Sequence, residues 1–212
     1  MTSVACIIIA SEPRKGLVFD AVLPSVLRQG FDEVVLVHDW PHNTFYIEGK
    51  WRDVRVGPVQ RNTLDALLKR DAGTLATTSK IIVYLCDDHA LAPNFLTELR
   101  SVLAEDWDVL VPNRYTLERT AGAHSDVGIL HQLNTGEAER YCGGHAMVVR
   151  RELVEALPWM SFAYGPWEHT RVWDVTHSHE LQRRGANFVW RPRSGIAIED
   201  LEPKDPRHYA TT

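Results

Sequence analysis

Two adjacent aspartates, Asp87 and Asp88, directly follow the apolar run at residues 80–86 (KIIVYLC). Neighbouring carboxylates repel each other, and burying both is costly unless a cation lies nearby. At the end of a buried strand, one of them can bind Mg²⁺ or Mn²⁺ while the other accepts hydrogen bonds from a ribose. The pattern is equally compatible with a structural role, in which the pair begins a turn and caps a following helix.

The first half of the chain alternates strand and helix patterns. Apolar, β-branched runs predict strands at 4–10, 33–38, 54–56, 80–86 and 109–111, and helical spacing predicts helices at 16–29, 61–70 and 94–104. This order predicts an α/β fold with a mostly parallel central sheet and helices on both faces. Ligands of such sheets bind beyond the carboxyl ends of the strands. The residues at those ends are Ser11-Glu12, Asp39-Trp40, Asp87-Asp88-His89 and Asn113-Arg114.

The second half has weaker periodicity. Residues 115–140 are typical of a loop or weak hairpin, and residues 157–173 are rich in aromatic residues, proline and glycine. Short strands are predicted at 145–150, 187–191 and 195–198, and helices at 151–156 and 174–184. Pro24 lies inside the first predicted helix, which is therefore expected to be kinked or to start late.

The composition is that of a single globular domain. The chain has 212 residues, 44% of them hydrophobic, and a formal net charge of −5, which gives no support for a general nucleic-acid binder. Its three cysteines are scattered and do not form a disulfide framework. No apolar stretch approaches the roughly 20 residues that span a bilayer, and no signal peptide opens the chain. We therefore expect a cytoplasmic protein.

The segment around the acid pair resembles the DxD segment of family 2 glycosyltransferases with the GT-A (Rossmann-like) fold. In that family an apolar strand leads into a short acidic cluster, and a proline follows five residues on, as Pro93 follows Asp88. The resemblance implies that Asp88 binds Mn²⁺ or Mg²⁺ and that Asp87 contacts the donor nucleotide. Cys86 stands where many members have another aspartate. A DxH interpretation of the same run makes His89 a second metal ligand.

Three further segments match the same family in order. Gln60-Arg61-Asn62 resembles an Ala-Arg-Asn element that faces the donor, and Asp39 matches the acidic residue that binds the nucleobase. The stretch Tyr141 to Leu153 resembles the Gly-Gly loop, strand and helix that close the sugar pocket; glycine there lets backbone amides approach the ligand. The resulting donor-binding residues are Ser11, Glu12, Asp39, Arg61, Asp87, Gly143 and Gly144.

The last match concerns the catalytic base. Trp173-Asp174, followed by Leu181-Gln-Arg-Arg-Gly185, resembles the family's Glu-Asp at the start of a helix, with Trp173 in place of the glutamate. The resemblance implies that Asp174 removes the acceptor's proton; the alternative is a helix N-cap. The predicted acceptor-binding residues are His145, Trp173 and His177. A zinc site formed by His177 and His179 is disfavoured, because a helix directs these two side chains apart.

The resemblance implies an inverting transfer of a sugar from a nucleotide-diphosphate donor, UDP-sugar being favoured, to an acceptor hydroxyl. One GT-A-like domain, 1–212, is expected to comprise a nucleotide-sugar-binding half (1–114), an acceptor-binding half (115–200) and a flexible tail (201–212). The expected acceptor is a saccharide or a lipid-linked sugar. The alternatives are a modified base in DNA, a metal-dependent hydrolase and an inactive nucleotide-sugar-binding module.

Overall fold

The computed structural model describes residues 2–41, 51–57, 62–116, 131–132, 146–162, 173–191 and 194–201, with the backbone alone at 62–63, 114–116, 131–132 and 173–175. Its core is a seven-stranded sheet in the order β10-β6-β9-β4-β1-β2-β3. All neighbouring strands are parallel except β9, which runs antiparallel to β4 and β6. The strands are β1 (Val4–Ala10), β2 (Glu33–His38), β3 (Arg52–Arg55), β4 (Ile81–Cys86), β6 (Val109–Val111), β9 (Ala146–Arg150) and β10 (Phe188–Trp190).

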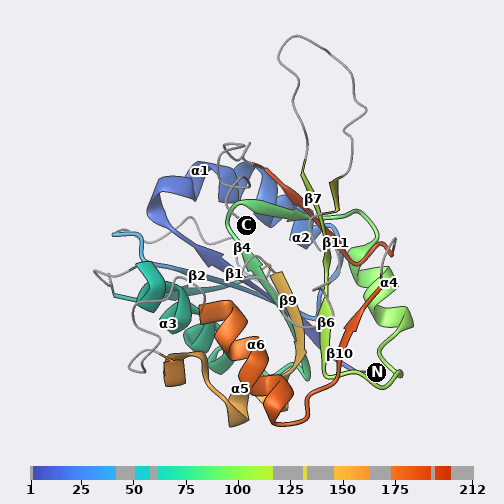
Figure 1. Cartoon of the computed structure of the whole chain (residues 1–212). Helices are drawn as coiled ribbons and strands as arrows, with labels where there is room; N and C mark the ends of the chain where they lie inside the picture. The colour runs from blue at the N-terminus through green and yellow to red at the C-terminus, as the bar shows by residue number, and fades with distance from the viewer. Residues whose placement is uncertain are drawn as a thin grey trace.

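Helices cover both faces of this sheet, as predicted (Figure 1). On one face lie α1 (Lys15–Leu17), α2 (Leu23–Leu27) and α4 (Phe95–Ser101), and on the other lie α3 (Asn62–Leu75), α5 (Arg151–Ala156) and α6 (Trp173–Arg183). The strands have apolar residues on both faces, so each side of the sheet has its own hydrophobic core. In the part of the chain that the structure describes, no helix has the length and apolarity needed to span a bilayer.

The register of the parallel strands brings three loops to one edge of the sheet. Ile9 lies opposite Cys86, and Ala10 lies opposite His38. The chain therefore leaves β1, β2 and β4 at nearly the same level, which places Ser11 and Asp87 side by side. This arrangement is the one expected for the ligand-binding edge of a parallel sheet.

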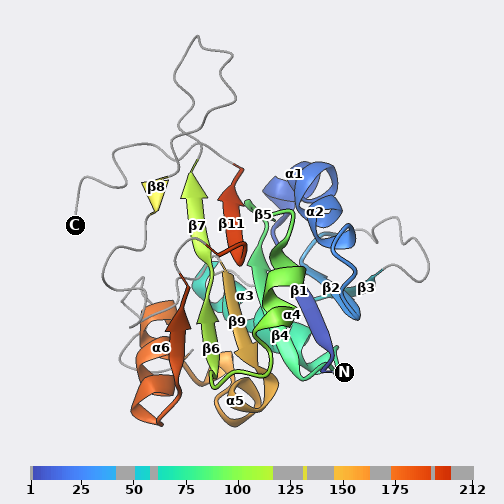
Figure 2. The same cartoon turned by 90° about the vertical axis from the view of Figure 1, so that its right-hand side faces the viewer.

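A second, smaller sheet stands beyond this edge (Figure 2). Its order is β5-β11-β7-β8, formed by β5 (His89–Leu91), β11 (Ala197–Asp200), β7 (Asn113–Thr116) and β8 (His131–Gln132). β5 and β7 continue the course of β4 and β6 after short breaks. Asp87 and Asp88 form the break between β4 and β5, so the acid pair is the turn by which the chain passes from one sheet to the other. The helix-capping alternative is wrong, because α4 begins only at Phe95.

The first helical region differs from a simple helix. It begins at Glu12 with a 3-10 turn, η1 (Glu12–Arg14), and contains a π-helical segment, η2 (Val18–Val22), between α1 and α2. Pro24 has no N–H and its ring crowds the carbonyl four residues earlier. The wider π turn, in which Leu23 N donates to Val18 O, directly precedes this proline. The helix therefore continues through Pro24 where a kink or a late start was predicted.

Candidate functional site

All four oxygens of the acid pair contact other groups of the protein. Asp87 Oδ2 accepts hydrogen bonds from Ser11 N at 2.7 Å and Ser11 Oγ at 2.5 Å, and Asp87 Oδ1 accepts one from Arg14 Nη1 at 3.0 Å. Asp88 Oδ2 lies 3.5 Å from Arg14 Nη2, and Asp88 Oδ1 lies 2.5 Å from His89 Nδ1. Both carboxylates are buried, and the guanidinium of Arg14, which contacts each of them, offsets part of their repulsion.

His89 is held between two carboxylates. Its Nδ1 faces Asp88, and its Nε2 lies 2.6 Å from Asp200 Oδ1 across the β5–β11 pair. The ring is fully buried, and Leu201 N donates to Asp88 O on the same strand pair. Because both ring nitrogens already face carboxylates, the arrangement suits His89 to orient Asp88 rather than to bind a metal directly.

Asp39, at the end of β2, belongs to a second charged cluster. Lys69 of α3 is buried, and its Nζ lies 3.3 Å from Asp39 Oδ1 and 2.5 Å from Asp65 Oδ2. Burial raises the pKa of Asp65; Lys69 opposes that change, and the nearby charges of Asp39 and Asp87 add to it. The carboxylates of Asp39 and Asp87 thus line the same part of the sheet edge, as the sequence predicted.

Trp40 closes the outer side of this region. Its ring is fully buried, stacks on His38 with centroids 4.3 Å apart, and lies under Lys15 Nζ at 5.1 Å. His38 Nε2 in turn lies 3.1 Å from Asp53 Oδ1 of β3. Trp40 therefore fixes the loop that carries Asp39 through core packing.

The other predicted residues are distributed as follows. Ser11 contacts Asp87, while Glu12 is exposed at the start of η1. Asp174 and Trp173 lie in the first turn of α6, where the structure describes the backbone. Four predicted residues lie outside the described ranges: Arg61, Gly143, Gly144 and His145.

The topology directs the first turn of α6 toward the site. α6 leads into β10, which runs parallel to β6. A helix that returns to a parallel strand runs opposite to the sheet, so it begins near the carboxyl ends of the strands. Figure 2 shows α6 next to β10, the edge strand that pairs with β6.

His177 does not face a ligand cleft in this structure. Its ring is fully buried and stacks on Trp159 with centroids 3.7 Å apart, while its Nε2 lies 3.3 Å from Leu157 O. Burial lowers the pKa of His177 to about 3, so the ring is neutral and packs as an aromatic core residue. His179, two residues on, is exposed, as expected of a helix that directs the two rings apart.

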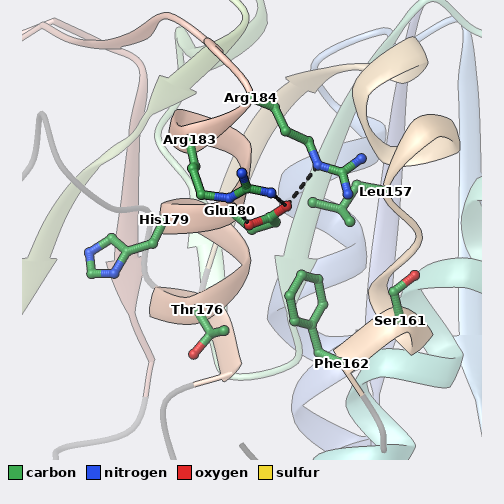
Figure 3. Close-up of a pocket in the computed structure, with 8 residues that line it drawn as sticks. All are labelled: Leu157, Ser161, Phe162, Thr176, His179, Glu180, Arg183 and Arg184. Carbon is green, nitrogen blue, oxygen red and sulfur yellow. Dashed lines mark hydrogen bonds and ion pairs between the residues drawn. The ribbon is translucent and has the colours of Figure 1, made fainter. Parts of the chain in front are cut away.

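A pocket of about 560 Å³ lies between α6 and the segment that contains Leu157, Ser161 and Phe162 (Figure 3). Phe162 and Leu157 form its apolar side, and the Glu180 carboxylate lies between the guanidinium groups of Arg183 and Arg184. These hydrogen bonds lower the pKa of Glu180 to about 2. The lining of the pocket on α6 extends from Thr176, two residues after Asp174, to the last turn of the helix at Arg183.

The acid pair has the chemistry of a metal site that a ligand completes. Among the described residues, no group of three or more His, Cys, Asp or Glu side chains is arranged to hold a metal ion. Mg²⁺ in nucleotide-binding enzymes commonly takes one or two carboxylates, several waters and substrate phosphates. Asp88 fits that pattern, and it would hold the ion jointly with a bound diphosphate.

Four contributors to this site were not predicted from the sequence: Arg14, Asp65, Lys69 and Asp200. Lys69 follows Asp65 by four residues on a predicted helix, which is a recognisable ion-pair spacing. Asp200 follows the predicted strand at 195–198 and could have been noted as a carboxylate at a strand end. Arg14 had no comparable signal, because its partners are 73 and 74 residues away in the sequence.

Comparisons with known proteins place this fold among glycosyltransferases. No protein-family model matches the chain, and no curated protein matches it. Among solved structures, S. aureus TarS 1–349 has a TM-score of 0.65 at 13% sequence identity, covering 94% of this chain and 60% of TarS 1–349. The complex of the same TarS fragment with UDP-GlcNAc has a TM-score of 0.63 at 11% identity, covering 100% and 62%.

A second glycosyltransferase gives the same result. The mannosyltransferase PcManGT from Pyrobaculum calidifontis, in complex with GDP-Man and Mn²⁺, has a TM-score of 0.61 at 12% identity, covering 97% of this chain and 59% of PcManGT. The chain thus spans about three fifths of the length of these structures. The likeness confirms the predicted fold class, a mixed α/β fold of the GT-A type.

Proposed function

We propose that this chain is a metal-dependent glycosyltransferase of the family 2 type, which transfers a sugar with inversion from a nucleotide-diphosphate sugar to an acceptor hydroxyl. The observation that supports this most is the acid pair Asp87-Asp88, buried at the turn between the two sheets and contacted by Ser11, Arg14 and His89. The shared fold with TarS and PcManGT supports the same proposal. UDP-sugars are the favoured donors.

In the proposed donor site, each acidic residue has a separate task. Asp88 binds Mn²⁺ or Mg²⁺, which when bound offsets the charge of the departing diphosphate. Asp87, aligned by Ser11, accepts hydrogen bonds from the ribose. Asp39, held by Lys69, binds the nucleobase. Ser11, Glu12, Arg61, Gly143 and Gly144 complete the proposed donor site.

The proposed chemical step takes place at the first turn of α6. The carboxylate of Asp174 accepts the proton of the acceptor hydroxyl while the hydroxyl oxygen bonds to the anomeric carbon. The bond between that carbon and the diphosphate oxygen breaks at the same time, and the diphosphate leaves with the electron pair. Attack from the opposite side inverts the anomeric centre. His145 and Trp173 are the proposed contacts to a saccharide or lipid-linked acceptor.

Release of nucleoside diphosphate from a panel of UDP-, GDP- and dTDP-sugars, with Mn²⁺ and simple saccharide acceptors, tests the proposal. We expect release with at least one donor, loss of release in EDTA, and loss in Asp174→Asn. A metal-dependent hydrolase would instead cleave substrates that contain no nucleotide. An inactive binding module would bind nucleotide with Mn²⁺, and Asp174→Asn would change nothing. Either result overturns the proposal.

A further inference from the structure

Arg14 occupies the position in which a cation is most needed. Its Nη1 lies 3.0 Å from Asp87 Oδ1 and its Nη2 lies 3.5 Å from Asp88 Oδ2, so one guanidinium spans both carboxylates. We propose that Arg14 is a built-in counter-ion that couples metal binding to donor binding. It competes with the divalent ion for Asp88 when no donor is present, and it binds the diphosphate when the donor arrives. This inference rests on the proposed function.

The contacts around the acid pair indicate which of them a metal ion can displace. Ser11 holds Asp87 through two short hydrogen bonds, and buried His89 holds Asp88 Oδ1. The remaining oxygen, Asp88 Oδ2, has the long contact to Arg14, whose side chain is 36% exposed against 10% for Asp88. A divalent ion would therefore reach Asp88 Oδ2 most readily by displacing the guanidinium of Arg14.

The charges explain why the donor should favour this exchange. Two carboxylates and one guanidinium leave the site with one net negative charge, whereas adding a divalent ion makes the same set net positive. A diphosphate restores the balance and gives the displaced guanidinium a new anionic partner. Arginine suits this role, because its planar fork binds phosphate oxygens in pairs.

The loop geometry allows such a movement. Arg14 ends the 3-10 turn that directly follows β1, so its backbone lies at the ligand-binding edge of the sheet. The next residue, Lys15, points instead over the Trp40 ring. These two adjacent cations thus serve different partners, which makes Lys15 a matched control for the loss of one positive charge.

The test measures Mn²⁺ affinity by electron paramagnetic resonance of the free ion, with and without UDP, and UDP affinity by calorimetry in saturating Mn²⁺. For Arg14→Gln we expect Mn²⁺ alone to bind about tenfold more tightly than it binds the wild type, and UDP to bind about tenfold more weakly. The coupling free energy between Mn²⁺ and UDP therefore falls. By linkage, the effect of each ligand on the affinity of the other must fall by the same factor. Lys15→Gln should change neither affinity by more than about twofold. Arg14→Lys, which keeps the charge and loses the fork, should restore the competition with Mn²⁺ but not UDP affinity.

The two proposals fail in different ways. If the wild type binds UDP with Mn²⁺ and Arg14→Gln, shown to be folded by its melting curve, changes neither affinity, the role of Arg14 is wrong and the donor site stands. Weaker binding of Mn²⁺ alone by Arg14→Gln also overturns the competition. If neither UDP nor GDP binds the wild type at all, the donor site itself is wrong, and the binding of Mn²⁺ alone still decides whether Arg14 competes for the acid pair.

Discussion

His89 and Asp200 face each other across the β5–β11 pair, with Nε2 of the ring 2.6 Å from Oδ1 of the carboxylate. The other ring nitrogen faces Asp88 at 2.5 Å. A carboxylate at the end of β11 is thus connected through one buried imidazole to the proposed metal ligand. Outer partners of this kind orient metal-binding groups, and removing one commonly lowers metal affinity or activity about 10- to 100-fold.

We therefore expect Asp200→Asn to weaken Mn²⁺ binding in the presence of UDP by about tenfold while the protein remains folded. Mn²⁺ titration followed by paramagnetic resonance measures the effect. Glu199→Gln is the matched control, because neighbouring residues of a strand point to opposite faces. Equal Mn²⁺ affinities of the wild type and Asp200→Asn would contradict a positioning role for Asp200.

Lys69→Met should lower both stability and nucleotide affinity. The substitution leaves Asp39 and Asp65 close together without the buried cation that now lies between them. Leaving such groups unpaired costs about 1–3 kcal/mol. Urea unfolding and UDP calorimetry measure the two effects. As a control, substitution of the exposed Lys80 by Met should alter neither stability nor UDP affinity. If Lys69→Met binds UDP as tightly as the wild type does, Asp39 does not need Lys69 for nucleotide binding.

His177 should make the fold sensitive to acid. Its pKa is about 3 in the folded protein and near 6.5 in the unfolded chain, so between these values the unfolded state binds a proton that the folded state does not. Stability therefore falls as the pH drops below about 6.5, by about 1.4 kcal/mol for each pH unit. Between pH 7.5 and 5.0, His177→Phe should lose about 2 kcal/mol less unfolding free energy than the wild type.

Urea unfolding at the two pH values measures this difference. Phenylalanine preserves the aromatic stack on Trp159, and His179→Gln, on the exposed side of α6, serves as the control for loss of a histidine. The same loss of stability at pH 5.0 in the wild type and in His177→Phe would contradict the burial of a neutral ring.

Asp174→Asn should separate catalysis from binding. A general base contributes about 10²- to 10⁴-fold to a rate, so turnover of the donor that serves as substrate should fall by at least about a hundredfold. Affinity for UDP with Mn²⁺ should stay within about twofold of the wild type, because the proposed donor site does not include Asp174. A variant that keeps full turnover would assign Asp174 to helix capping alone.

The sequence predicted the central sheet well because its strands are buried on both faces. β1 and β2 have the predicted bounds, since each has a run of apolar, mostly β-branched residues that is typical of a buried parallel strand. The same reasoning located the acid pair at a strand end and brought Asp39 to the same edge. Local pattern was sufficient for these elements.

The second sheet and the ion pairs could not be predicted in the same way. β5 has only three residues and was not predicted, while β11 was predicted two residues early, at 195–198. The two strands pair across more than 100 residues of sequence, and no local periodicity indicates such a pairing. The contacts of Arg14 and Lys69 likewise depend on tertiary packing. The π-helical segment before Pro24 was missed because a proline inside a helical pattern predicts a break, whereas a wider turn can accommodate it.

The central claim is that Asp88 binds a divalent ion together with a nucleoside diphosphate. The most direct measurement is the melting temperature of the wild type and of Asp88→Asn with UDP and with GDP, each with and without Mn²⁺. A ligand that binds only the folded state raises this temperature, so we predict a rise in the wild type that requires both nucleotide and Mn²⁺ and that is lost in Asp88→Asn. The same rise in both proteins, or none in the wild type with either nucleotide, would contradict the claim.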